Sequence, residues 1–144
     1  SDTTLDFDLE LAKQQSAENP VYYVQYAHAR ICSILRVAKE SGISVPSAGD
    51  ADLSLLNHDA EIDLIKKLAE LPDLIAEAGA SYEPHRLTRY AQDLAAVFHK
   101  FYTECRVVSE EKALTGARLV LVDSTRTVLA NTLSLLGISA PERM

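Results

Sequence analysis

Tyr23 and Arg30 have the side-chain types and the spacing needed to bind single-stranded nucleic acid. At about 100° per residue, positions seven apart in a helix share one line, so Tyr23, Arg30 and Val37 form a strip with Tyr26 beside it. An aromatic ring and a guanidinium on one face can stack a base and hold a phosphate. The spacing also fits a plainer interpretation, in which the tyrosines edge the core and Arg30 pairs with a carboxylate.

A second strip with similar chemistry lies in the segment that begins at Pro84. Tyr102 is its better candidate for stacking a base, whereas a histidine inside such a helix is usually a half-buried packing residue, the role we assign to His99. The strip repeats at helical spacing and consists of Thr88, Gln92, Ala95, His99, Tyr102 and Arg106.

Three long amphipathic helices must position these strips. The first begins at Pro20, with Asn19 as its N-cap, and ends at Ser41; the second begins at Pro84; the third covers residues 109–136. Their predicted buried stripes are Val24, Ala27, His28, Ile31, Leu35 and Ala38; then Leu87, Ala91, Leu94, Phe98, Phe101 and Cys105; then Leu114, Ala117, Leu121, Val128, Thr132 and Leu135.

Two local features define the third helix. Ser109 is its predicted N-cap, which places Glu110 and Glu111 in the first turn, near the positive end of the helix dipole. Gly116 costs up to about 1 kcal/mol relative to alanine inside a helix, which predicts a close approach to a neighbouring helix.

The rest of the chain predicts shorter elements, and its acidic residues are interpreted as a solvated face. With the long helices they predict an all-α bundle of about five helices. The shorter elements are a helix within 6–15, a loop over 42–50, a helical turn within 52–57, a helix over 59–71 and a helix over 73–78 closed by Gly79.

The net charge of −7 argues against nucleic-acid binding at first sight, because a basic face is the usual footprint of such proteins. The charge is unevenly distributed, however. Residues 40–83 contain ten acidic side chains against two lysines, whereas residues 20–39 contain three basic side chains and no acid. Residues 84–144 carry eight basic against six acidic side chains. The helices with the aromatic strips are therefore neutral to basic, and a local RNA face remains compatible with the composition.

Catalytic and metal-binding patterns are missing from the sequence. There is no glycine-rich nucleotide loop, HExxH or GxSxG, and His58 with Glu61 gives two ligands without a third. Cys32 and Cys105 lack CxxC spacing and are predicted to be reduced, buried thiols. No segment predicts a signal peptide or a membrane span.

The stretch NPVYYVQYAHAR, from Asn19 to Arg30, resembles the junction in class I arginyl-tRNA synthetases between the catalytic domain and the helical anticodon-binding (DALR) domain. The resemblance continues through YAQDLAAVFHKFYTECRV, ARLVLVDSTRTVL and the final LLGISAPERM. It implies that residues 1–18 are the remnant of the catalytic-domain junction and that residues 19–144 are the anticodon-binding domain. The DALR-like tetrapeptide is only half kept, as Lys112-Ala113-Leu114-Thr115.

The resemblance implies a function without a catalytic centre in this chain, because the ATP-handling sequences of class I synthetases are absent. It implies docking of the anticodon loop of arginine tRNA, a catalytic domain in the same polypeptide that uses ATP and Mg²⁺, and action as a cytoplasmic monomer. We expect stacking by Tyr23 and Tyr102, a phosphate or base-edge contact from Arg30, and packing of Met144 against a base. The complete set of expected RNA-binding residues is Tyr23, Tyr26, Arg30, Tyr102, Arg106 and Met144.

Two other functions stay open at this point. The chain could be the DALR-type domain of another synthetase, such as the glycyl β subunit, although the NPVYYVQYAHAR string argues against that. It could also be a helical protein–protein interaction module with exposed tyrosines. RNA binding must weaken steeply with salt, whereas an aromatic protein interface need not.

Overall fold

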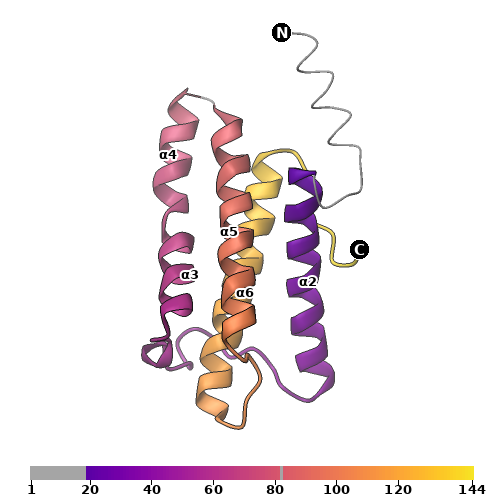
Figure 1. The fold of residues 1–144 in the computed structure, drawn as a ribbon, viewed down its shortest axis with the longest axis vertical. Helices are drawn as coiled ribbons and strands as arrows, with labels where there is room; N and C mark the ends of the chain where they lie inside the picture. The colour runs from indigo at the N-terminus through magenta and orange to yellow at the C-terminus, as the bar shows by residue number, and fades with distance from the viewer. Residues whose placement is uncertain (1–18, 82) are drawn as a thin grey trace.

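A computed structural model of the chain describes residues 19–81 and 83–144, and within them every regular element is helical. In Figure 1, α3 and α4 stand nearly end to end and form one column of the bundle, beside α5, α6 and α2. The predicted all-α bundle is confirmed. Its elements are α2 (Pro20–Glu40), the 3₁₀ turn η1 (Leu53–Leu55), α3 (Asp59–Ala69), α4 (Leu71–Ser81), α5 (Pro84–Glu104) and α6 (Lys112–Leu135).

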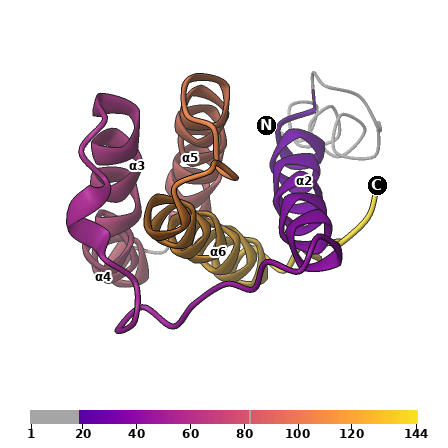
Figure 2. The same cartoon turned by 90° about the horizontal axis from the view of Figure 1, so that it is seen from below.

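The helices α5 and α6 occupy the middle of the bundle. Helix α2 packs on both of them from one side, and α3 also packs on both from the other, as the view from below in Figure 2 shows. The acidic α3–α4 column is thus separated from α2 by the two central helices. The predicted short helix within residues 6–15 and the predicted 1–18 junction lie outside the described residues.

Helix α2 forms where local signals predicted it. The Asn19 side chain accepts hydrogen bonds from the backbone N–H groups of Val21 (3.0 Å) and Tyr22 (3.4 Å), and Pro20 occupies the first turn. Gly42 ends the helix with a φ of 83°, a conformation that costs glycine little. The predicted stripe is buried except for Leu35, which is half-buried against the core.

Helix α6 differs from its prediction in start, stripe and glycine contact. It begins at Lys112, so Glu110 and Glu111 precede the first turn, because Ser109 instead exchanges hydrogen bonds with the Thr115 side chain. A Cβ on Gly116 would meet the ring of Pro46 at 3.4 Å, so the close neighbour is the loop after α2 rather than a helix.

The buried residues of α6 also extend beyond one stripe. Leu135 is 55% exposed, and Leu114 and Val128 are only half-buried. Because α6 contacts α2, α3 and α5, more of its circumference is buried than a single amphipathic stripe predicts. The large apolar residues that the prediction left out are Leu119, Val120, Val122, Leu129 and Leu133.

Two predictions for the middle of the chain are also wrong in detail. Gly79 lies within α4, which continues to Ser81, instead of ending the helix. Glu61 is not part of a solvated face, because its side chain is only 1% exposed. Cys105 is buried as predicted, whereas Cys32 is half-buried, and both thiols are free.

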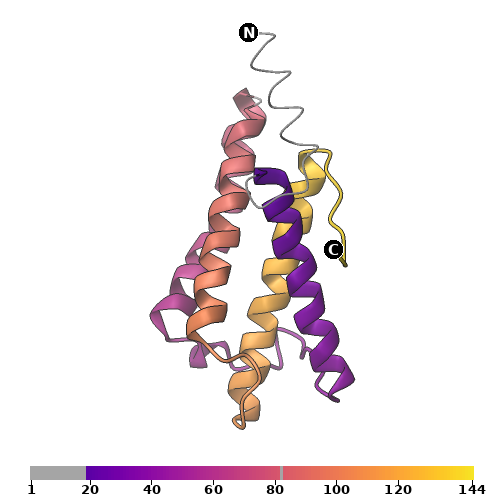
Figure 3. The same cartoon turned by 45° about the vertical axis from the view of Figure 1, so that its right-hand side comes forward.

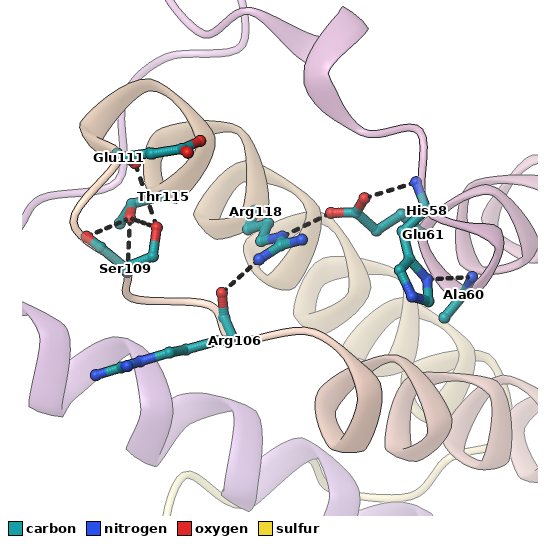
Figure 4. A network of polar contacts seen from close by, with 8 residues as sticks. All are labelled: His58, Ala60, Glu61, Arg106, Ser109, Glu111, Thr115 and Arg118. Carbon is teal, nitrogen blue, oxygen red and sulfur yellow. Dashed lines mark hydrogen bonds and ion pairs between the residues drawn. The ribbon is translucent and has the colours of Figure 1, made fainter.

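Glu61 is compensated by a polar network that joins α3 to α6 and to the segment after α5 (Figure 4). One carboxylate oxygen accepts from the backbone N–H of His58 at 3.0 Å, completing a capping box at the start of α3. The other pairs with Arg118 Nε at 2.7 Å, and Arg118 Nη1 donates to the Arg106 carbonyl at 2.6 Å. A buried charge is tolerated only when paired and hydrogen-bonded in this way.

Phe98, fully buried on α5, gives a direct test of the core. Replacing Phe98 with alanine should lower the free energy of unfolding by about 3–5 kcal/mol, because it leaves a cavity among large side chains. Urea denaturation followed by far-UV circular dichroism measures the change. Val108→Ala, at a position 38% exposed, is the control and should cost far less. A loss below about 1 kcal/mol for Phe98→Ala would contradict the packing of α5.

Candidate nucleic-acid interface

Arg30 lies over the ring of Tyr102, where α2 and α5 pack together. The guanidinium carbon is 5.1 Å from the ring centroid, a distance typical of a cation–π contact. Tyr102 in turn stacks on the buried ring of Phe98, with centroids 6.1 Å apart and planes 16° apart. Arg30 makes no ion pair with any carboxylate in the described part of the chain. The core therefore orients Tyr102, and Tyr102 orients an exposed guanidinium.

Tyr23 is more deeply placed than a free stacking platform. It is half-buried, packs against the core, and its ring lies 5.7 Å from that of His99 at 49°. Burial raises the pKa of the Tyr23 hydroxyl above 10.0. His99 is half-buried, as predicted, and burial followed by the nearby charge of Arg30 holds its pKa below the ordinary 6.5. Tyr23 therefore packs at the edge of the core and remains partly exposed on the side of α2 that carries Arg30.

Two adjoining depressions meet at Arg30. The larger, which we call the α2–α5 groove, has a volume of about 830 Å³ and is lined by Tyr102 and Arg106 as well as Arg30. The smaller, which we call the tail hollow, has about 270 Å³ and is lined by Tyr26 and Met144. Arg30 and Ser33 line both. Five of the six expected RNA-binding residues therefore line one continuous surface, and Tyr23 lies outside the two linings.

The exposed tips of this surface suit a flexible polyanion. Tyr26 is 44% and Met144 is 52% exposed, and Arg30 and Arg106 are also exposed. The two linings contain four arginines, which are Arg30, Arg36, Arg106 and Arg143, against two acids, Glu104 and Glu142. Aromatic faces, guanidinium groups and small hydroxyls on one curved surface can stack bases and bind phosphates.

Arg106 is held through its backbone rather than its side chain. Its carbonyl accepts from Arg118, while its side chain extends away from Arg118 in Figure 4. The strip pattern identified Arg106, but it gave no sign of Arg118 or of Glu61. Glu61 is a buried acid among exposed ones, and its pairing with Arg118 is visible only in the folded structure.

Metal binding finds no support in the described residues, where no group of three His, Cys, Asp or Glu side chains could hold an ion. His58 instead caps α3, accepting from the backbone N–H of Ala60 at 3.0 Å. No helix in the described ranges is long and apolar enough to cross a membrane.

The fold and this surface define a class, an all-α domain with a basic and aromatic groove between two helices. Residues 24–144 match the family described as the DALR anticodon binding domain. The chain belongs to that family.

Known relatives agree with the match. The chain is 60% identical over its full length to the arginine–tRNA ligases of Heliobacterium modesticaldum and Moorella thermoacetica, and it spans 26% of each. Among solved structures, the arginyl-tRNA synthetase of Thermus thermophilus superposes with a TM-score of 0.73 at 37% identity, over 90% of this chain and 22% of that one. The Plasmodium falciparum arginyl-tRNA synthetase gives 0.73 at 27% identity, over 92% and 22%. The chain thus spans about a quarter of the length of its curated relatives.

The pKa of His99 reports directly on the position of Arg30. The Arg30→Ala substitution removes one of the two causes of the low pKa of His99. This pKa should therefore rise toward 6.5 but stay below it, because the ring remains buried. An NMR titration of the His99 ring measures this. The pKa of His99 is lower in the folded state than in the unfolded chain. The contribution of neutral His99 to the free energy of unfolding is therefore fully present above pH 6.5 and is lost as the pH falls through the folded-state pKa. An unchanged pKa in Arg30→Ala would contradict the proximity of the two groups.

Proposed function

We propose that this domain binds the anticodon loop of arginine tRNA as part of an arginine–tRNA ligase. A catalytic domain in the same polypeptide would carry out aminoacylation with ATP and Mg²⁺ and receive the acceptor end of the docked tRNA. The family match and the names of the relatives support this proposal. It includes the expectation that the whole protein acts as a monomer in the cytoplasm.

The observation that carries the proposal is the Arg30–Tyr102 contact at the junction of the α2–α5 groove and the tail hollow. A guanidinium already stacked on a ring loses less side-chain entropy when it binds a phosphate or a base edge. Splayed loop bases could then enter the depressions on either side, against Tyr102 in one and against Tyr26 and Met144 in the other. Arg106 adds a second cation along the groove.

A helical protein–protein module remains the rival of a different class. The four arginines in the two linings favour RNA as the partner, because they can bind phosphates. Phosphate contacts release counterions, so the affinity for RNA should depend on salt concentration. A DALR-type domain of a glycyl β subunit would share that dependence. It is distinguished by comparing glycine tRNA with arginine tRNA in the same titration.

Arg30→Ala should weaken binding of arginine tRNA by about tenfold or more, because it removes a charged hydrogen-bond donor. Loss of one phosphate contact on single-stranded loop RNA should also reduce the salt slope of log K by about 0.7. The melting temperature should stay nearly unchanged, since Arg30 is exposed and a surface cation–π contact is worth roughly 0.5–1 kcal/mol. Titrations at three salt concentrations, with a thermal melt, measure these quantities.

Arg89→Ala is the matched control, because it removes the same charge from an exposed position on α5 that lines neither depression. It should leave both affinity and slope close to those of the parent chain. Equal effects of the two substitutions would mean that binding depends on net charge alone, and that Arg30 has no specific contact.

The 144-residue chain alone should not charge tRNA with arginine. The sequences by which class I synthetases handle ATP are absent from it. Incubation of the pure chain with ATP, Mg²⁺, arginine and arginine tRNA, followed by measurement of acid-precipitable arginine, tests this. Measurable charging by this chain would overturn the division of labour that we propose.

A further inference from the structure

The last seven residues of the chain run back along α2 instead of leaving the bundle. Gly137, with a φ of 72°, reverses the chain after α6, and the N–H of Ile138 donates to the Leu133 carbonyl at 2.9 Å. From there the segment follows α2 in both Figure 1 and Figure 3. We call residues 138–144 the tail.

Two side chains of α2 bind the tail backbone at successive points. Gln25 Nε2 donates to the Ser139 carbonyl at 3.0 Å and lies 3.3 Å from the Ser139 hydroxyl oxygen. His28 Nδ1 lies 2.8 Å from the Pro141 carbonyl oxygen, 113 residues away in sequence. Since a carbonyl oxygen only accepts, Nδ1 must carry the proton of that bond. Gln25 and His28, which we call the latch, therefore fix the tail one helical turn apart.

The proline at the second point suits an extended tail. Pro141 disfavours helical backbone at Ala140, so the chain enters the latch already extended. Ile138 and Ala140 pack against the core, and the His28 ring is only 4% exposed. Beyond Pro141 no further hydrogen bond joins the tail to the described residues. The His28 bond is thus the last fixed point before Met144.

The His28–Pro141 bond limits how far Met144 can move from the tail hollow. Met144 lies three residues beyond Pro141, and an extended chain spans at most about 3.5 Å per residue, or roughly 10 Å. Without the His28 bond the nearest hydrogen-bonded anchor is Ser139, five residues from Met144, and without both bonds of the latch it is Ile138, six residues away. The effective concentration of a tethered group falls as about the −3/2 power of tether length, which gives a decrease of about twofold for loss of the His28 bond and about threefold for loss of both bonds.

We propose that His28, assisted by Gln25, is a positioning residue that latches the tail so that Met144 stays beside Tyr26 and Arg30 for RNA binding. The inference rests on the proposed function, since it assigns the latch a role in the same site. Through the tail alone, loss of the His28 bond should weaken binding of arginine tRNA about twofold, and loss of both bonds about threefold.

The matched test uses His28→Asn and His28→Gln. The amide nitrogen of asparagine sits on Cγ, as Nδ1 does, so asparagine can still donate to Pro141. The amide nitrogen of glutamine is one bond further out and misses that position. Glutamine is the better helix former, so a purely structural role predicts that His28→Gln is the milder substitution. The proposal predicts the reverse, with affinity near the parent's for His28→Asn and about twofold lower for His28→Gln, because the Gln25–Ser139 bond remains.

A truncation completes the cycle. In a chain ending at Pro141, His28→Gln should cause no further loss of RNA affinity, because there is no Met144 left to position. Equal losses in the full and truncated chains would overturn the positioning role, and so would equal affinities of the asparagine and glutamine variants.

A second readout works without RNA. The chain contains no tryptophan, so Met144→Trp introduces a single fluorophore at the tail. Its anisotropy should fall with His28→Gln and stay high with His28→Asn. If the parent chain fails to bind arginine tRNA, the proposed function falls, while the anisotropy pair still decides whether the latch exists. No difference in anisotropy would overturn the latch itself.

Discussion

Both the core and the candidate site depend on the contacts of the Phe98 ring. It is fully buried on α5, with the Phe101 ring 5.9 Å away and the Tyr102 ring stacked nearly parallel at 6.1 Å. Tyr102 then supports the guanidinium of Arg30 on the neighbouring helix. Side chains in a close-packed interior cannot shift independently. The aromatic stack therefore extends the order of the core to the surface, where an exposed arginine would otherwise sample many rotamers.

Local periodicity predicted most of the buried stripes of α2 and α5, and both helices begin at a proline. On α5, however, Leu87 is only half-buried, and Ala95, which was assigned to the adjacent strip, is fully buried. Local periodicity was insufficient for α6, whose buried residues extend around more of its circumference than one stripe. The start of α6 was missed because Ser109 bonds to Thr115 instead of capping the first turn. Competition between local caps and nearby side chains of this kind leaves no periodic signal in the sequence.

Spacing placed Arg30 and Tyr102 on separate strips, but only the structure shows that the strips meet. The polar contacts that fix the surroundings were beyond prediction from the residues. Arg118 and Glu61 are 57 positions apart, and Glu61 resembled its exposed acidic neighbours in sequence. His28 looked like a core residue of the α2 stripe, which it is, but its partner is a backbone carbonyl that any residue would supply. The type of a side chain indicates its chemistry. A backbone carbonyl can come from any residue, so a long-range backbone partner cannot be predicted from residue types.

The fold also reconciles an acidic chain with the proposed RNA-binding surface. Helices α3 and α4 carry five acidic side chains against two lysines and lie across α5 and α6 from α2 (Figure 2). Charges separated by more than about 8 Å are largely screened at physiological ionic strength, and one helix is already about 10 Å wide. A loop at the α2–α5 groove and the tail hollow would therefore interact mainly with the four arginines and two acids that line them. The distant acids would still repel longer stretches of nucleic acid, which favours a short local contact over non-specific binding along the whole domain.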